Sequence, residues 1–181
     1  MRKLSMKELG RKSVEEFKLS EKFSITVVLE NIRSAYNVGS VFRTADAFLI
    51  EAIYIIGYSA KPPHKEIKKT ALGAEETVEW KYFKTTAEAI EELKIKNYKI
   101  YAVEQTESSF KLQAAGFRQN EKIAVIFGNE VSGLEQLTID ACDGCIEIPQ
   151  LGMKHSLNIA TAAGVVLWEL VRTGINSPLS P

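Results

Sequence analysis

The sequence predicts an α/β fold with a mostly parallel sheet that helices cover on both faces. Three observations support this prediction. Short β-branched or apolar runs alternate along the chain with segments whose apolar residues recur at helical spacing. The runs are almost continuously apolar, which is typical of strands buried on both faces. The chain has 181 residues, of which 45% are hydrophobic and 25% charged, and this suits one globular domain.

The N-terminal part of the chain, residues 1–22, is polar and lysine-rich and is expected to form a helical arm. Two Ser-x-x-Glu patterns, Ser5 to Glu8 and Ser13 to Glu16, fit capping boxes. In a capping box the serine hydroxyl and the later carboxylate satisfy open backbone N–H groups at a helix start. A disordered tail with two chance matches is the alternative.

The main domain, residues 23–172, is expected to begin with a β-branched strand at 25–29. A strand at 52–57 and a Pro- and Lys-containing loop at 59–69, which runs into a short helix, come later. Between the two strands, apolar residues recur at i, i+3, i+4 and i+7, the stripe of an amphipathic helix. They are Val38, Val41, Phe42, Ala45, Phe48 and Leu49.

The second half of the domain continues the alternation. A helix is expected at 85–97, with Thr85 or Thr86 as its N-cap. The last helix is expected at 156–172, before a terminal tail at 173–181. The remaining strands are short and are expected at 78–83, 99–103, 122–127 and 145–148.

Charge and hydropathy narrow the classes of partner. The 23 Lys and Arg balance 23 Asp and Glu, and nucleic-acid affinity comes largely from neutralised phosphates, so any RNA contact must use local basic patches. No apolar run approaches the ~18 residues that cross a bilayer, and no signal peptide is recognisable. A cytoplasmic location without a membrane contact is therefore expected. The candidate RNA patches, each of which could equally be a solvated surface, are Lys61, Lys65, Lys68 and Lys69, and Arg2, Lys3, Lys7, Arg11 and Lys12.

The sequence lacks the motifs of several common nucleotide-binding and hydrolase sites. There is no G-x-G-x-x-G after the first strand, no P-loop and no G-x-S-x-G elbow. One C-x-x-C is present, Cys142 to Cys145, but a zinc site needs about four ligands and the only histidines, His64 and His155, are far away in sequence. Buried small residues are the favoured interpretation of the two cysteines, and no metal site is expected.

Polar residues gather in three clusters, each at the end of a predicted strand. They are ENIRSAYNVGSVFRTAD at 30–46, IFGNEVSGL at 126–134 and IPQLGMKHSLN at 148–158. In this order and at this spacing they resemble the motifs of the SpoU/TrmH family, within the SPOUT superfamily of RNA methyltransferases. The resemblance covers roughly residues 23–172, and three motifs at such separations make it specific.

The resemblance implies a fold whose C-terminal segment forms a trefoil knot, a rare exception to the rule that chains stay unknotted. It implies that S-adenosylmethionine binds in the knot, and that the protein is a homodimer with active sites built across the subunit interface. The implied reaction is methyl transfer to a ribose 2′-hydroxyl of structured RNA, usually tRNA or rRNA.

The resemblance also assigns roles to residues. The catalytic positions fall on Arg43, Asn37, Glu130, Ser156 and Asn158. The cofactor-binding positions fall on Glu104, Gln105, Phe127, Gly128, Asn129, Ile148 and Leu157. Gly128 is expected to let the backbone approach the cofactor closely. One departure is Gln150, where many relatives carry methionine, and it bears on packing around the cofactor rather than on the reaction.

The chemistry of two of these residues can be considered directly. Arg43 is expected on the polar face of its helix together with Ser40. The family's arginine is often proposed as a general base, but a guanidinium stays protonated in proteins. We therefore expect Arg43 to hold a phosphate and to stabilise negative charge that develops on the 2′-oxygen. Ser156 is expected to be the N-cap of the last helix.

Two other functions remain as alternatives: a non-catalytic RNA-binding module with the same fold, and methylation of a base rather than the ribose. The joint presence of Asn37, Arg43, Glu130, Ser156 and Asn158 argues against a pure binder. The motif around Arg43 and the Ser-Leu-Asn triplet favour the ribose.

Overall fold

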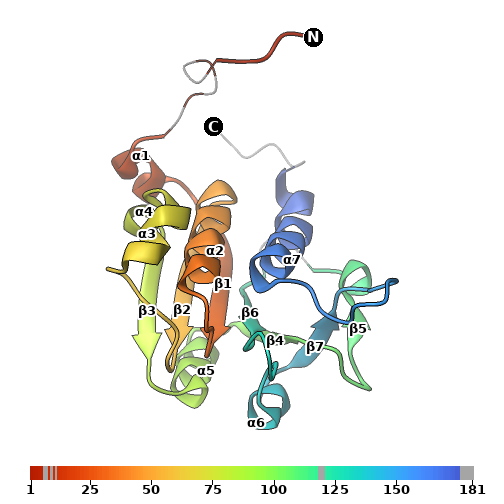
Figure 1. Cartoon of the computed structure of the whole chain (residues 1–181). Coiled ribbons are helices and arrows are strands. Elements are labelled where there is room, and N and C mark those ends of the chain that lie inside the picture. The colour runs from red at the N-terminus through yellow and green to blue at the C-terminus, as the bar shows by residue number, and fades with distance from the viewer. Residues whose placement is uncertain (6–7, 9, 11, 118–120, 176–181) are drawn as a thin grey trace.

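The computed structural model describes residues 1–5, 8, 10, 12–117 and 121–175 and confirms an α/β fold with a parallel sheet (Figure 1). Within those ranges the sheet has seven strands in the order β3-β2-β1-β6-β4-β7-β5, and every adjacent pair is parallel. The strands are β1 (Phe23–Glu30), β2 (Ile50–Ile56), β3 (Glu79–Phe83), β4 (Lys99–Val103), β5 (Phe110–Lys111), β6 (Ile123–Phe127) and β7 (Gly144–Glu147). The helices are α1 (Val14–Leu19), α2 (Ala35–Ala47), α3 (Lys65–Ala71), α4 (Ala74–Thr77), α5 (Thr86–Ile95), the 3-10 turn η1 (Leu112–Ala114), α6 (Gln136–Asp140) and α7 (Ile159–Ile175).

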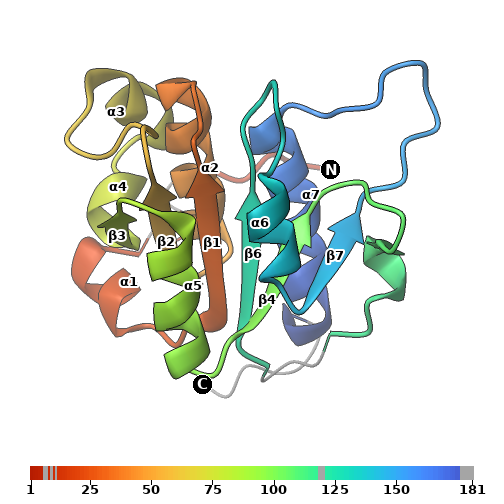
Figure 2. The ribbon, with the colours of Figure 1, turned by 90° about the horizontal axis from the view of Figure 1, so that it is seen from below.

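Helices cover both faces of the sheet, as Figure 2 shows: α5 and α6 lie on the near face and α2 and α7 on the far face. Each face has its own hydrophobic core, and successive residues of a strand point to opposite cores. Val27 and Leu29 of β1 pack with the α2 and α7 side, whereas Val28 packs with the α5 side. All three are fully buried, which explains why this strand is apolar at consecutive positions.

Most predicted elements are present, with ends shifted by a few residues. The Ser13 hydroxyl accepts from the Glu16 N–H at 3.1 Å, and the Glu16 carboxylate accepts from the Ser13 N–H, so the predicted capping box at the start of α1 is confirmed. Thr85 is the N-cap of α5, as one of the two alternatives predicted. At the earlier pattern the Glu8 carboxylate accepts from the Ser5 N–H at 2.8 Å, but the Ser5 hydroxyl donates to that carboxylate at 2.7 Å instead of accepting from the Glu8 N–H, so the second predicted capping box is present only in part.

The predicted start of the last helix is wrong. Helix α7 begins at Ile159, and Ser156 lies in an exposed segment before it. The Asn158 side-chain oxygen accepts from the Ala160 N–H at 2.9 Å, so Asn158 caps the helix in place of Ser156. At the other end α7 continues to Ile175, and residues 176–181 of the expected tail lie outside the described part.

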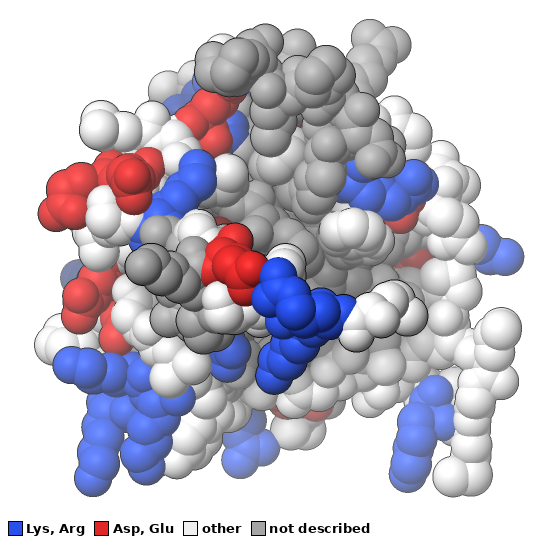
Figure 3. All heavy atoms as spheres, turned by 90° about the horizontal axis from the view of Figure 1, so that it is seen from above, with Lys and Arg blue, Asp and Glu red and all other residues white. Residues whose placement is uncertain are grey.

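Charged side chains are spread over the surface. On the face in Figure 3, Lys and Arg side chains form several separate groups with Asp, Glu and uncharged residues between them. This pattern agrees with the zero formal net charge. Among the described residues, no helix is long and apolar enough to cross a membrane.

Candidate functional site

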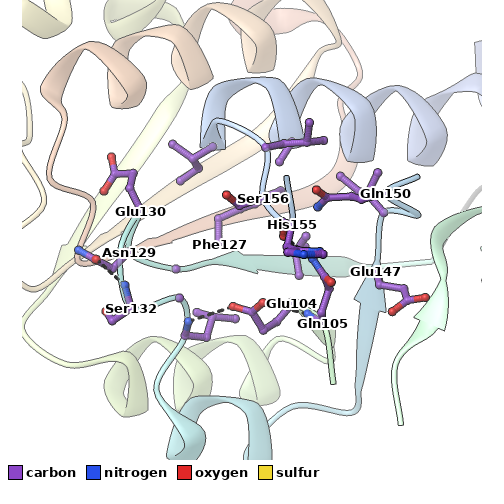
Figure 4. Close-up of a pocket in the computed structure, with 18 of the residues that line it drawn as sticks. Glu104, Gln105, Phe127, Asn129, Glu130, Ser132, Glu147, Gln150, His155 and Ser156 are labelled. Carbon is purple, nitrogen blue, oxygen red and sulfur yellow. Dashed lines mark hydrogen bonds between the residues drawn. The ribbon is translucent and has the colours of Figure 1, made fainter. Parts of the chain in front are cut away.

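A pocket of about 460 Å³ lies at the carboxyl ends of β4, β6 and β7. Three segments line it: residues 103–105 after β4, residues 127–134 after β6, and parts of 146–162 between β7 and the first turn of α7. The carboxyl ends of parallel strands share one edge of the sheet, so segments far apart in sequence meet there. Figure 4 shows their labelled side chains around one cavity.

All seven residues predicted to bind a cofactor line this pocket. They are Glu104, Gln105, Phe127, Gly128, Asn129, Ile148 and Leu157. Phe127, Ile148 and Leu157 supply apolar walls, and the others supply polar groups. A volume in this range, with mixed walls, is typical of a site for a small organic molecule or cofactor.

Sequence reasoning missed several lining residues, among them Val131, Ser132, His155 and Ala162. Three of these four lie inside motifs that were singled out, and position within a motif was the signal that could have found them. His155 matters through its backbone, because the Gln105 side-chain amide donates to the His155 carbonyl at 2.7 Å. This bond holds the long segment after β7 over the end of β4.

The turn after β6 explains why residue 128 is glycine. The backbone of Asn129 exchanges hydrogen bonds with that of Gly133 at 3.1 and 2.9 Å, so the chain folds back on itself at once. A Cβ added to Gly128 would lie 2.4 Å from the Gly133 carbonyl carbon and 2.5 Å from the Leu134 nitrogen. Residue 128 must therefore be glycine because the backbone of residues 133 and 134 folds back against it. This reason differs from the predicted one, a close approach of the backbone to a cofactor.

The pocket is acidic. Glu104, Glu130 and Glu147 line it, and none of the described residues in its wall is Lys or Arg. The Glu104 carboxylate accepts from the Gln105 N–H at 2.9 Å, while the Glu147 carboxylate accepts from the Ser109 hydroxyl at 2.8 Å. Carboxylates grouped in this way favour a ligand that carries positive charge.

A hydrogen-bonded cluster beside the pocket joins all three motifs. The Asn158 side-chain amide donates to the Asn37 side-chain oxygen at 3.1 Å, and the Asn37 amide donates to the Glu130 carboxylate at 2.9 Å. Glu130 also accepts from the backbone N–H groups of Arg33 and Ser34, at 2.9 and 3.2 Å. Three of the five predicted catalytic residues are thus in direct contact.

These contacts set the charge of Glu130. Partial burial raises the pKa of its carboxyl group, but hydrogen bonds from the Arg33 N–H, the Asn37 amide and other N–H groups lower it more. The resulting pKa lies below the usual value of 4.5. Glu130 is therefore ionised at neutral pH and acts as the acceptor that organises the cluster.

The other two predicted catalytic residues are placed differently. Ser156 lines the pocket and is exposed (Figure 4). Arg43 is exposed on α2, as its predicted place on the polar face requires. It is not among the residues that line the pocket, and no described residue forms a hydrogen bond or ion pair with its side chain. The single chain does not bring Arg43 to the cluster.

Cys145 is buried and Cys142 is half-buried, and both act as hydrogen-bond donors. The Cys142 thiol donates to the Thr138 carbonyl at 3.1 Å, and the Cys145 thiol donates to the Glu104 carbonyl at 3.2 Å. Burial raises the pKa of both, that of Cys142 to about 12. Both thiols therefore remain protonated, and the predicted burial is complete for Cys145 and partial for Cys142. Within the described ranges, no group of three or more His, Cys, Asp or Glu could hold a metal ion.

A family model and two relatives of known name all relate this chain to RNA methyltransferases. The model of the SpoU rRNA Methylase family matches residues 24–168. The chain is similar to the 23S rRNA (guanosine-2′-O-)-methyltransferase of Haemophilus influenzae, with 30% identity over 175 residues, 94% of this chain and 69% of the relative. It is also similar to the tRNA (guanosine(18)-2′-O)-methyltransferase of Thermus thermophilus, with 29% identity over 95% of this chain and 87% of the relative.

A solved structure supports the fold. The AdoMet-bound rRNA methyltransferase of Sinorhizobium meliloti superposes with a TM-score of 0.78 at 24% identity. The match covers 84% of this chain but only 57% of that longer protein.

Proposed function

The chain belongs to the SpoU rRNA methylase family, and we propose that it transfers a methyl group from S-adenosylmethionine to a ribose 2′-hydroxyl in tRNA or rRNA. Two relatives that match nearly the whole chain are named as guanosine 2′-O-methyltransferases, one of 23S rRNA and one of tRNA. The observation that carries the proposal is the direct contact of Asn158, Asn37 and Glu130 beside an acidic pocket. A protein that only bound RNA would have no use for this arrangement.

The residues of the pocket suit the cofactor. S-adenosylmethionine supplies, when bound, an electrophilic methyl group on a positively charged sulfur. Glu104, Glu130 and Glu147 favour that charge. The apolar side chains of Phe127, Ile148 and Leu157 offer a surface for the adenine ring, and Gln105 and the backbone of Gly128 and Asn129 offer polar contacts.

The chain's own residues position the reacting groups and stabilise the charge that develops during methyl transfer. Glu130 fixes Asn37, and Asn37 fixes Asn158, so that the ends of three loops keep one geometry. Methyl transfer needs the attacking oxygen, the methyl carbon and the sulfur in line, so positioning contributes strongly to the rate. Ser156 contacts the RNA in this proposal, and its exposure at the pocket wall supports that role. Arg43 holds the phosphate next to the reacting ribose and stabilises charge on the 2′-oxygen.

Because Arg43 lies apart from the pocket of its own chain, the proposal includes a homodimer in which it serves the pocket of the partner. Exposed apolar side chains support a second copy, since such patches mark interaction sites. Trp168 of α7 is 50% exposed, and Leu151 and Met153 of the segment before α7 are more exposed still. A second copy could cover all three.

The proposal also includes the finer architecture that the motifs imply: a catalytic domain at 23–172 flanked by an arm at 1–22 and a tail at 173–181, and a trefoil knot near the C-terminus. Support for the knot comes from the segment between β7 and α7. It runs far from the sheet and returns to the end of β6 (Figure 2), where Asn158 meets Asn37 of α2.

The reaction can be tested without knowing the RNA. The protein is incubated with methyl-labelled cofactor and total tRNA and rRNA from a cell deficient in RNA modification, and labelled nucleotides are mapped by mass spectrometry. We expect one or a few 2′-O-methylated nucleotides that are absent with the Arg43→Ala variant. Label on a base would show that the protein methylates a base and not the ribose. RNA binding without any methyl transfer would show that the protein is a binding module and not an enzyme.

A further inference from the structure

Three tyrosine rings are exposed at the carboxyl edge of the sheet, on the side away from the pocket. They are Tyr36 at the start of α2, Tyr58 just after β2 and Tyr82 in β3, with exposed fractions of 42%, 64% and 38%. A tyrosine combines a large apolar ring with a polar hydroxyl, so tyrosines are enriched at interaction surfaces. We call these three residues the tyrosine row.

Hydrogen bonds fix the row relative to the proposed active site. The Asn129 side-chain amide donates to the Tyr58 hydroxyl at 2.6 Å, and Asn129 directly precedes Glu130. The Tyr58 N–H donates to the Asn31 side-chain oxygen at 3.4 Å. The Tyr82 hydroxyl donates to the carbonyl of Gly57, the neighbour of Tyr58, at 3.1 Å. The rings therefore continue outward from the second motif toward the edge strand.

Lysine ammonium groups accompany the row. Lys61 Nζ lies 3.5 Å from the centre of the Tyr82 ring. Lys69 Nζ lies 5.8 Å from the centre of the Tyr36 ring and 3.5 Å from its hydroxyl. No described carboxylate forms an ion pair with either lysine. Their charges remain available to neutralise phosphates.

We propose that the tyrosine row binds an unpaired RNA strand that leads to the reacting ribose, with bases stacked on Tyr58 and Tyr82 and phosphates on Lys61 and Lys69. This inference rests on the proposed function. Aromatic rings combined with cations are the usual platform for single strands, because every base has a π-face to stack. In a duplex the bases are stacked on one another, and recognition proceeds through the backbone and the minor groove instead. The target nucleotide is therefore expected in a loop or a single-stranded region.

The inference is tested with two RNA probes that differ in pairing. One is a hairpin with a seven-nucleotide loop, and the other is a fully paired duplex of the same length. Binding to the full chain without cofactor is measured by fluorescence anisotropy at two salt concentrations. We expect the hairpin to bind about tenfold more tightly than the duplex.

Matched variants assign this preference to the row. Tyr58→Ala and Tyr82→Ala should each weaken hairpin binding about tenfold and leave duplex binding unchanged, since they remove a stacking surface. Tyr58→Phe and Tyr82→Phe keep the ring without the hydroxyl and should bind within about twofold of the wild type. Lys61→Gln should lower the salt slope by about one, because one phosphate contact is lost. Lys94→Ala, an exposed lysine of α5, is the control and should change nothing.

Two results would overturn the inference: equal binding of hairpin and duplex, or wild-type hairpin binding by both alanine variants. Either result leaves the proposed function intact if labelled methyl groups still reach total RNA. Conversely, if the wild type transfers no label, the proposed function fails, while the two probes still decide whether the row binds unpaired RNA. Thermal melting of each variant, compared with its phenylalanine counterpart, separates loss of the ring from loss of the fold.

Discussion

Helix α2 has two stretches in opposite environments. Asn37, in its first turn, is held between the Glu130 carboxylate and the Asn158 amide. Arg43, six residues later and about 9 Å further along the axis at 1.5 Å per residue, is exposed and pairs with no described residue. The chain thus orders by itself the part of the site that borders the pocket. It leaves the Arg43 guanidinium for another molecule.

This difference separates the effects of substitution. A change in the ordered part alters both local structure and methyl transfer, because the side chains there hold one another. A change at Arg43 removes no side-chain hydrogen bond or ion pair among the described residues.

Arg43→Ala should lower methyl transfer about 100-fold or more, the cost typical of losing a donor that stabilises developing negative charge. Its stability should stay within about 0.5 kcal/mol of the wild type, as for other surface substitutions. Arg43→Lys should recover only part of the rate, because an ammonium cannot form the paired bonds of a guanidinium. Single-turnover rates and thermal melting check these values. Wild-type turnover in Arg43→Ala would remove Arg43 from the mechanism.

Gly128→Ala should weaken cofactor binding about tenfold, because the new Cβ would meet the Gly133 backbone at 2.4 Å and displace the loop. Gly128→Val should weaken it further. Gly152→Ala is the matched control, since a Cβ at Gly152 meets nothing within 4 Å. Isothermal titration calorimetry with S-adenosylmethionine compares the three variants. Unchanged affinity in Gly128→Ala and Gly128→Val would show that this loop does not shape the cofactor site.

The smallest effect concerns acid stability. The folded-state pKa of Glu130 is lower than 4.5, its ordinary value, so the carboxylate stabilises the fold above about pH 4.5 and this contribution is lost as the pH falls through the lower folded pKa. Glu130→Gln removes the titrating group. The stability difference between wild type and variant, measured by urea unfolding, should therefore be largest near neutral pH and shrink in acid. A difference that is constant from neutral pH into acid would contradict the lowered pKa.

The sequence was most informative where a pattern repeats along an element. The apolar stripe of α2 identified its buried face, including Val38 and Phe42, both fully buried. All seven residues predicted to bind the cofactor line one pocket. Five of them lie in the motifs, and Glu104 and Gln105 follow the predicted strand at 99–103. Short elements gave no such pattern: β5 has two residues and α6 has five, without a side-chain cap at Glu135.

The N-cap of α7 and the reason for a glycine at position 128 could not be predicted, because both depend on tertiary contacts. Ser156 and Asn158 are both residue types that cap helix N-termini well, so the sequence does not decide between them. In the structure Asn158 is the cap, and its side chain also contacts Asn37, a tertiary contact that the sequence does not show. The reason for Gly128 depends on how tightly residues 128–133 fold back, which spacing alone does not give.

Mixed dimers would test most directly whether Arg43 completes the pocket of a second copy. Arg43→Ala subunits and Gly128→Val subunits, each shown to be folded by thermal melting, are unfolded, mixed and refolded together, and transfer is assayed at a cofactor concentration too low to fill the Gly128→Val pocket. If Arg43 acts across the interface, the mixed dimer contains one site with an intact pocket and an intact arginine, and methyl transfer should return to about a quarter of the wild-type rate, since half of the dimers are mixed and half of their sites are complete. If Arg43 acts within its own chain, every site in the mixture lacks one component, and transfer that stays at the level of the separate variants would contradict the account.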